Sequence, residues 1–118
     1  MFLFIHIGAY SQGVTVTDTK LSADTNFNPI FKVTIKNSTD KAVTNVMFSL
    51  KFSIKDANPY DRFSTKFEDK NVEISISPKS SETTTMNITC PYIEDMKTEF
   101  TGYMITKVRF SDGSTESY

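Results

Sequence analysis

The sequence holds little of the chemistry on which enzymes commonly depend. Its 118 residues include one histidine, His6, one cysteine, Cys90, and no tryptophan. Proton transfer near neutral pH usually relies on histidine, so a Ser-His-Asp or Cys-His arrangement has almost nothing to draw on. A zinc site of histidine and cysteine needs several such ligands. The four glycines, at positions 8, 13, 102 and 113, form no phosphate-binding loop. We therefore predict a protein that is not an enzyme and holds no metal ion or cofactor.

A single cysteine excludes an intramolecular disulfide, and the spread of charge argues against a polyanionic partner. Cys90 shares the parity of Met86 and Ile88 on an expected strand, which predicts a small buried residue and not a reactive thiol. Thirteen basic residues against fourteen acids give a formal net charge of -1, and the basic residues form no cluster. Nucleic-acid binding depends on such clusters, so nucleic acid is not an expected partner.

Carboxylates are the remaining candidates for chemistry. A glycosidase needs only two acids, and oxygen ligands from a loop can bind calcium. The acids considered are Asp56, Asp61, Glu68 and Asp69 around one turn and Glu94, Asp95 and Glu99 in another, with Asn58 as a further calcium ligand. Acids and asparagines in polar turns usually face solvent or shape the turn, so we expect neither a catalytic pair nor a calcium site.

The first eleven residues differ from the rest and predict a secretory signal peptide. Positions 1–10 are apolar apart from His6, and about ten residues cannot span a bilayer, which needs roughly twenty. Ala9 and Ser11 supply the small residues of a signal-peptidase site, and the segment resembles bacterial leader sequences. Because no lysine or arginine precedes the apolar run, an ordinary first strand is the alternative. The expected organisation is a signal peptide at 1–11 and one domain at 12–118, without a membrane span.

The clearest structural signal is the alternation of apolar and outward-facing residues from Val46 to Lys55. Apolar side chains stand at every second position, and Met47 is the one apolar residue in the other set. A period of two fits an extended strand with one face in a core and one in water. Similar sets, separated by turn-forming residues, predict strands at 13–21, 31–35, 43–55, 72–76, 84–90, 100–110 and 115–118, and a short strand or aromatic loop at 62–68.

These strands, with no amphipathic helix, predict one all-β domain, an antiparallel immunoglobulin-like β-sandwich of about seven strands. Within it, 94–99 is expected to be a loop or a single helical turn. The double-sided apolar pattern of 100–110 indicates a strand that is buried on both faces or carries a bulge. Asp112-Gly113 is a hairpin signal.

Three short segments resemble bacterial immunoglobulin-like modules. Asn37-Ser38-Thr39-Asp40-Lys41 is similar to the turn between their second and third strands. Ile76-Ser77-Pro78-Lys79-Ser80-Ser81-Glu82-Thr83 looks like their Pro-Gly-Glu-Thr segment, with Lys79 in place of glycine, and Phe52-Ser53-Ile54-Lys55-Asp56 is loosely similar to the signature of FxLYD domains. The resemblance covers about 31–110 and implies an extracytoplasmic, non-catalytic module without nominating a ligand.

Binding is therefore the expected function. The candidate binding surface consists of the aromatic residues Tyr60, Phe63, Phe67 and Tyr92. If they are exposed, they form a platform for sugar or protein; if they close the core, they are packing, which we favour because aromatic rings supply most of the apolar mass. We expect a secreted or periplasmic protein–protein interaction module, an accessory subunit of a bacterial cell-envelope assembly. The short last strand suggests an edge left open for a partner's strand. A carbohydrate-binding module is the alternative.

Overall fold

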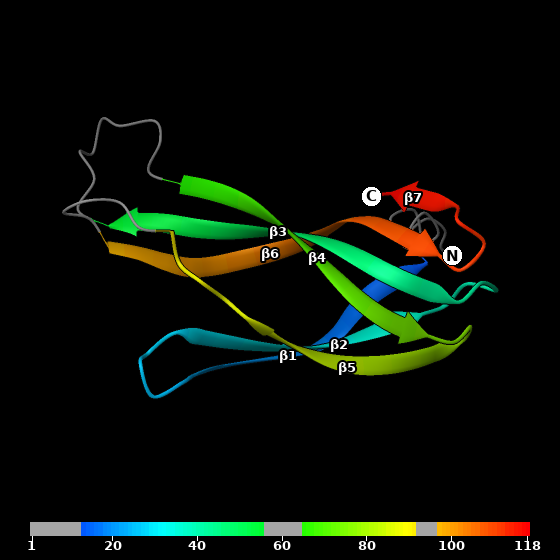
Figure 1. Ribbon diagram of the computed structural model, residues 1–118, viewed down its shortest axis with the longest axis horizontal. Coiled ribbons are helices and arrows are strands. Elements are labelled where there is room, and N and C mark those ends of the chain that lie inside the picture. The colour runs from blue at the N-terminus through cyan, green and yellow to red at the C-terminus, as the bar shows by residue number, and fades with distance from the viewer. Residues whose placement is uncertain (1–12, 56–64, 92–96) are drawn as a thin grey trace, which may run out of the picture.

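The computed structural model describes residues 13–55, 65–91 and 97–118, which form seven strands and no helix (Figure 1). The strands are β1 (Val14–Ala23), β2 (Pro29–Asn37), β3 (Val43–Lys55), β4 (Thr65–Ile76), β5 (Ser80–Asn87), β6 (Lys97–Phe110) and β7 (Thr115–Ser117). They make two antiparallel sheets packed as a sandwich, so the predicted fold class is confirmed. The expected signal peptide at 1–11 lies outside the described residues.

The two sheets are the upper and lower layers of Figure 1. One has the strand order β1-β2-β5 and the other β4-β3-β6-β7. The chain passes from one sheet to the other between β2 and β3, between β4 and β5, and between β5 and β6. A constant-type immunoglobulin domain keeps its fourth strand with the first, second and fifth, whereas β4 here pairs with β3.

Strand β3 is the centre of the four-stranded sheet, because it pairs with β4 on one side and β6 on the other. Its alternate apolar side chains are at most 4% exposed: Val46, Phe48, Leu50 and Phe52. They meet buried residues of the other sheet in one core, including Phe31, Val33, Ile35, Met86 and Ile88. The alternation in the sequence thus reports the buried face of the central strand.

Strand β4 is longer than the sequence indicates. The pattern predicts separate segments at 62–68 and 72–76, but a single strand runs from Thr65 to Ile76 and pairs with β3, without a register shift from Thr65 to Glu73. The charged residues between the two apolar segments indicate a loop that separates two strands. Pairing with β3 overrides that local composition, because the ladder satisfies the backbone groups throughout.

Strand β6 carries two bulges and begins earlier than expected. Lys97 pairs with Lys55 and Glu99 with Ser53, so the described part of the predicted loop or helical turn is strand. The register between β3 and β6 skips Thr101 and Thr106. Each bulge moves the inward-facing residues from even to odd positions or back, which explains why apolar residues occur at both even and odd positions of 100–110.

Asn37 links two of the three connections that cross between the sheets, β2–β3 and β4–β5. It is the one buried polar residue among those described, with 0% exposure. Its Nδ2 donates to the carbonyl oxygens of Lys41 (2.8 Å), Ile76 (3.1 Å) and Ser77 (3.3 Å). Its Oδ1 accepts hydrogen bonds from the backbone N–H (3.0 Å) and hydroxyl (2.6 Å) of Thr39. One side chain therefore holds the β2–β3 turn against the end of β4.

The β4–β5 turn contains a lysine in a backbone conformation that favours glycine. Lys79 has a φ of 62°, and the Ser80 N–H donates to the Ser77 carbonyl (3.3 Å), as in a type II turn with Pro78 at its second position. Lys79 Nζ donates to the Ser38 carbonyl (2.7 Å) and lies 3.3 Å from Asp40 Oδ1. Lys79 is thus left-handed, and its side chain joins the neighbouring turn.

Candidate functional site

The predicted aromatic surface is described only at Phe67, since Tyr60, Phe63 and Tyr92 lie outside the described residues. Phe67 is 60% exposed on β4, opposite Lys51 of β3, on the outer face of the four-stranded sheet. The packing interpretation is therefore wrong for Phe67. Lys51 also pairs with Gly102 of β6 on its other side. In this cross-strand row, Lys51 is therefore the only side chain beside the Phe67 ring on β3 and β6.

The two described acids near the first candidate turn do not converge. Glu68 and Asp69 are adjacent on β4, so their side chains point to opposite faces, and Glu68 Oε2 lies 3.7 Å from Lys66 Nζ. The acids at 56 and 61, with Asn58, lie outside the described residues, as do Glu94 and Asp95. In the parts of the chain that are described, no three or more His, Cys, Asp or Glu side chains form a group that could hold a metal ion.

The outer edge of β6 is partly open and lies next to a groove between the two sheets. β6 has 14 residues, but β7 has three and pairs with it only at Lys107, Val108 and Arg109. One further bond runs from the Tyr118 N–H to the Thr106 carbonyl (2.9 Å). From 97 to 105, no strand among the described residues pairs with this edge.

A groove of about 340 Å³ runs beside this open edge. It lies between the two sheets, where β1 and β6 face each other. Tyr103 forms part of its wall and packs against Phe31 and Phe48, with ring centroids 5.0 and 6.3 Å away. The residues that line the groove are Val14, Thr15 and Val16 of β1, Tyr103, Met104 and Ile105 of β6, and Tyr118. An extended chain could thus find both backbone partners and apolar contacts here.

Tyr118 closes one end of the groove and joins the two sheets. The Val14 backbone N–H donates to the Tyr118 Oη (2.9 Å), and the ring packs against the core. Burial raises the pKa of Tyr118 to about 12, although the hydrogen bond from Val14 acts in the opposite direction. The phenol is therefore neutral at physiological pH and serves as a structural contact.

The β1–β2 hairpin presents an exposed phenylalanine that lies between the strands predicted at 13–21 and 31–35. Phe27 is 88% exposed and has a φ of 63°. Asp24 shapes the turn: its Oδ1 accepts from the N–H groups of Asn26 (2.8 Å) and Asn28 (2.9 Å), and these bonds hold the pKa of that carboxyl below its usual range. The sequence signal for this exposed ring was an aromatic residue among turn-forming residues, in the run Asp24-Thr25-Asn26-Phe27-Asn28.

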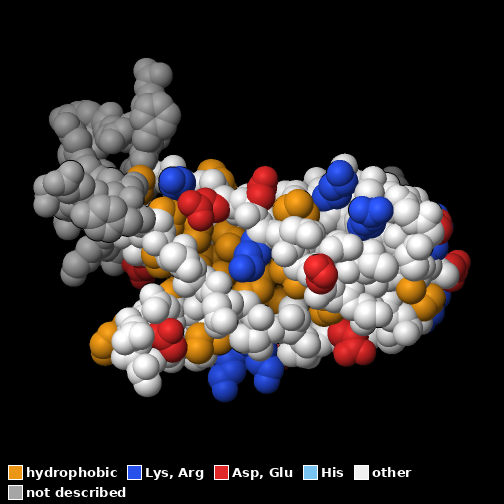
Figure 2. Space-filling model, in the orientation of Figure 1, with side chains coloured by type: hydrophobic (Ala, Val, Ile, Leu, Met, Phe, Trp, Pro, Cys, Tyr) orange, Lys and Arg blue, Asp and Glu red, His pale blue; other side chains and the backbone are white. Residues whose placement is uncertain are grey.

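Phe27 and Leu21, which is 55% exposed, border a hollow that also reaches Cys90 and Phe100. Met86 and Ile88 are fully buried, but Cys90 lies beyond the end of β5 and is only partly buried beside the core, so the prediction of a buried strand residue is met only in part. On the face shown in Figure 2, apolar side chains are visible between the two layers near the end from which this hairpin projects.

Comparison with known proteins assigns no family: no protein-family model, curated protein or solved structure matches the chain. Within 13–55, 65–91 and 97–118, no helix has the length and apolarity needed to cross a membrane. The functional proposal therefore rests on the geometry of the surfaces alone.

Proposed function

We propose that this protein is a non-catalytic, secreted or periplasmic immunoglobulin-like module that binds a partner protein in a bacterial cell-envelope assembly. The partner supplies an extended segment that adds to the open edge of β6. The observation that carries the proposal is the mismatch between the long β6 and the short β7, which leaves the edge from 97 to 105 without a strand partner among the described residues.

The groove beside the edge supports the same mode of binding. Strand addition gains affinity from main-chain hydrogen bonds and specificity from pockets for alternate side chains. Val16 and Ile105 are partly buried and face the groove from opposite sheets, while Met104 is 57% exposed at its rim. A long exposed edge beside apolar side chains is a surface that monomeric proteins usually protect. Among the described residues, the two bulges of β6 interrupt this edge.

Two lysine substitutions of matched chemistry test the proposal. Met104→Lys places a charge at the groove, and Leu21→Lys places the same charge on an equally exposed apolar residue of β1 outside it. Affinity purification from envelope extract of the native host with the unmodified chain should recover a specific partner. The Leu21→Lys variant should retain that partner and Met104→Lys should lose most of it.

Hydrogen exchange then locates the contact. The partner should slow amide exchange in 98–105 of β6 more than in β4 or β5, which are also edge strands. Recovery of the same partner by both variants, or protection confined to β5, would contradict strand addition at β6. Mass spectrometry of the protein from its host tests the compartment: export predicts a mature chain that begins at Gln12.

Carbohydrate binding by ring stacking is a second candidate, favoured by the exposure of Phe67. An exposed ring on a flat sheet face suits the apolar face of a sugar. A glycan array should then show binding that Phe67→Ala abolishes and Phe27→Ala leaves intact. Silence of the array for the unmodified chain dismisses this candidate.

A further inference from the structure

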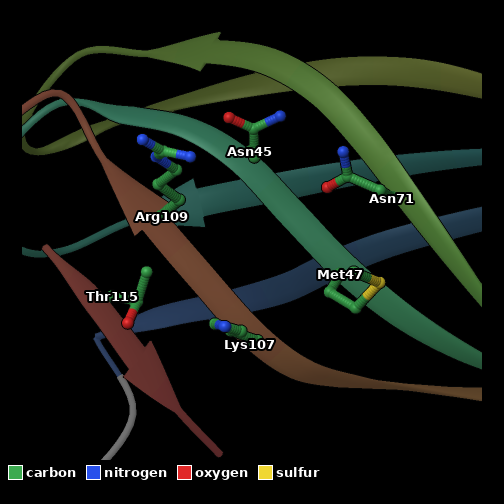
Figure 3. A pocket seen from close by; sticks show the side chains of 6 residues that line it. All are labelled: Asn45, Met47, Asn71, Lys107, Arg109 and Thr115. Atoms are coloured by element: carbon green, nitrogen blue, oxygen red, sulfur yellow. The ribbon is translucent and has the colours of Figure 1, made fainter. Parts of the chain in front are cut away.

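A second surface, separate from the open edge, has the composition of a ligand site. On the outer face of the four-stranded sheet, a groove of about 270 Å³ receives side chains from all four strands (Figure 3). It is lined by Asn45 and Met47 of β3, Asn71 of β4, Lys107 and Arg109 of β6, and Thr115 of β7. We refer to these six residues as the basic groove.

The register of the sheet places these residues side by side. Arg109 lies between Asn45 and Thr115 in one cross-strand row. In the next row, Met47 lies between Lys107 and Asn71. Strands are about 4.8 Å apart and same-face neighbours about 7 Å apart, so the two rows form a patch of roughly 14 by 7 Å. Residues up to seventy positions apart in sequence thus meet on one surface.

The two cations in the groove have no ion pair among the described residues. Lys41, Lys66 and Lys79 are each paired with a carboxylate, whereas Lys107 and Arg109 are not. Both stand on the same face of β6, one pleat apart, so their charges repel each other. The nearest acid by register is Glu73, which pairs with Asn45 on the side away from Arg109 and does not line the groove. A bound anion would relieve this repulsion.

The neutral residues indicate more than a simple anion site. The side-chain amides of Asn45 and Asn71 make no hydrogen bond to any described residue, and each offers a donor and an acceptor. Met47, the one apolar residue at the outward positions of β3, stands between Asn71 and Lys107. Amides suit hydroxyl groups, a thioether suits C–H groups, and the cations suit a carboxylate or sulfate.

We propose that the basic groove binds an acidic saccharide, a sugar that carries a carboxylate or a sulfate group. The anionic group contacts Lys107 and Arg109, and the sugar hydroxyls contact Asn45 and Asn71. A protein partner is less suited to this groove, because it is lined by only six residues, of which two are charged and three are neutral and polar, and protein interfaces need a larger apolar centre. The site uses none of the residues at the open edge of β6, so it stands whether or not strand addition is correct.

The test is a nitrogen-15 NMR titration of the full chain with defined probes. A galacturonic acid trisaccharide and a sulfated disaccharide supply the two anionic groups, a galactose trisaccharide is the neutral control, and a glutamate hexapeptide represents an acidic protein segment. Lys107→Gln, Arg109→Gln and Asn71→Asp alter the groove, while Lys32→Gln removes a similar exposed lysine from the other sheet. All four positions are exposed, so circular dichroism should show unchanged folds.

At least one acidic sugar should shift the amide signals of β3, β6 and β7 around the groove, and the neutral sugar should not. Lys107→Gln or Arg109→Gln should weaken this binding roughly tenfold or more, as expected for loss of a charged hydrogen bond, and Lys32→Gln should change it less than about twofold. Asn71→Asp should weaken it by repulsion. The proposal is overturned if neither acidic sugar binds or if only the acidic peptide binds. It is also overturned if Lys107→Gln in the groove and the control Lys32→Gln weaken binding equally.

Discussion

At the scale of single residues, the buried amide of Asn37 contributes most to the junction between the sheets. Its five hydrogen bonds are made at 0% exposure, where an unmade bond cannot be replaced by one to water. The chain offers an internal control, because Asn87 on β5 is exposed and makes no such contacts.

Asn37→Ala should lower the free energy of unfolding by about 2–4 kcal/mol, since it leaves buried carbonyl and N–H groups without partners. Asn87→Ala should change it by less than about 0.5 kcal/mol. Urea unfolding followed by circular dichroism measures both. Equal effects of the two substitutions would show that the network around Asn37 adds little to stability.

Two hairpins of this chain have the same backbone design but different residues at the strained position. In both, an N–H donates to a carbonyl three residues back at 3.0 Å: Phe27 to Asp24, and Gly113 to Phe110. The donor residue has a φ of 63° in the first hairpin and 87° in the second. This matches the three-residue loop with a left-handed third residue, where glycine is the unstrained choice.

Phe27→Gly should therefore leave stability unchanged or raise it by up to about 1 kcal/mol, because the relief of left-handed strain offsets the added freedom of the unfolded chain. Gly113→Ala should lower stability by about 1 kcal/mol for the opposite reason. Thermal unfolding of the two variants provides the comparison. A loss above about 1 kcal/mol in Phe27→Gly would show that the exposed ring packs in solution, contrary to its 88% exposure.

At the scale of elements, the contact between β1 and the end of β7 depends on the neutral phenol of Tyr118. Its pKa is about 12 in the folded protein, against 10.0 for the free side chain. Because the folded state holds the proton more tightly, the contribution of Tyr118 to stability is complete below pH 10. It is lost as the pH rises from about 10 toward 12.

Tyr118→Phe keeps the ring but removes the titrating group and the acceptor for the Val14 N–H. The difference in unfolding free energy between the unmodified protein and Tyr118→Phe should shrink as the pH rises from 9 toward about 12. Chemical denaturation at a series of pH values measures this difference, and the other titrating groups cancel. A difference that stays constant across the window would mean that the phenol is not desolvated by folding.

The elements also show where sequence reasoning succeeds and where it stops. β3 was predicted with its observed bounds, because from Val46 to Phe52 its alternate apolar residues lie in the core and mark the strand clearly. The continuity of β4 and the early start of β6 were missed, because both depend on pairing with β3 and not on local composition. The bulges of β6 left a trace in sequence, since each shifts the parity of the apolar residues.

The candidate sites were harder to predict than the strands. The short last strand pointed to an open edge, and the structure places that edge on β6 beside an apolar groove. The basic groove had only one sequence signal, the outward Met47, because its residues come from four strands and meet through register alone. Register is set by long-range pairing and turn geometry, which a single sequence does not display.

At the scale of the whole molecule, both sheets contribute to a single core. Phe48 is 0% exposed at its centre, and the Phe31 ring of the other sheet contacts Phe100, with centroids 5.1 Å apart. Neither sheet has a second apolar layer of its own among the described residues, so neither can bury its inner face without the other. Folding of the two sheets is therefore expected to be one event.

Unfolding should be a single cooperative transition, with the same midpoint by far-ultraviolet circular dichroism and by tyrosine fluorescence. Phe48→Ala should lower the free energy of unfolding by about 3–5 kcal/mol and shift both midpoints together, because its cavity opens in the shared core. Met104→Ala, on an exposed residue of β6, is the control and should shift neither midpoint appreciably. Two separate transitions, or a shift of one probe without the other in Phe48→Ala, would mean that the sheets are independent units and that the open edge of β6 belongs to a separable layer.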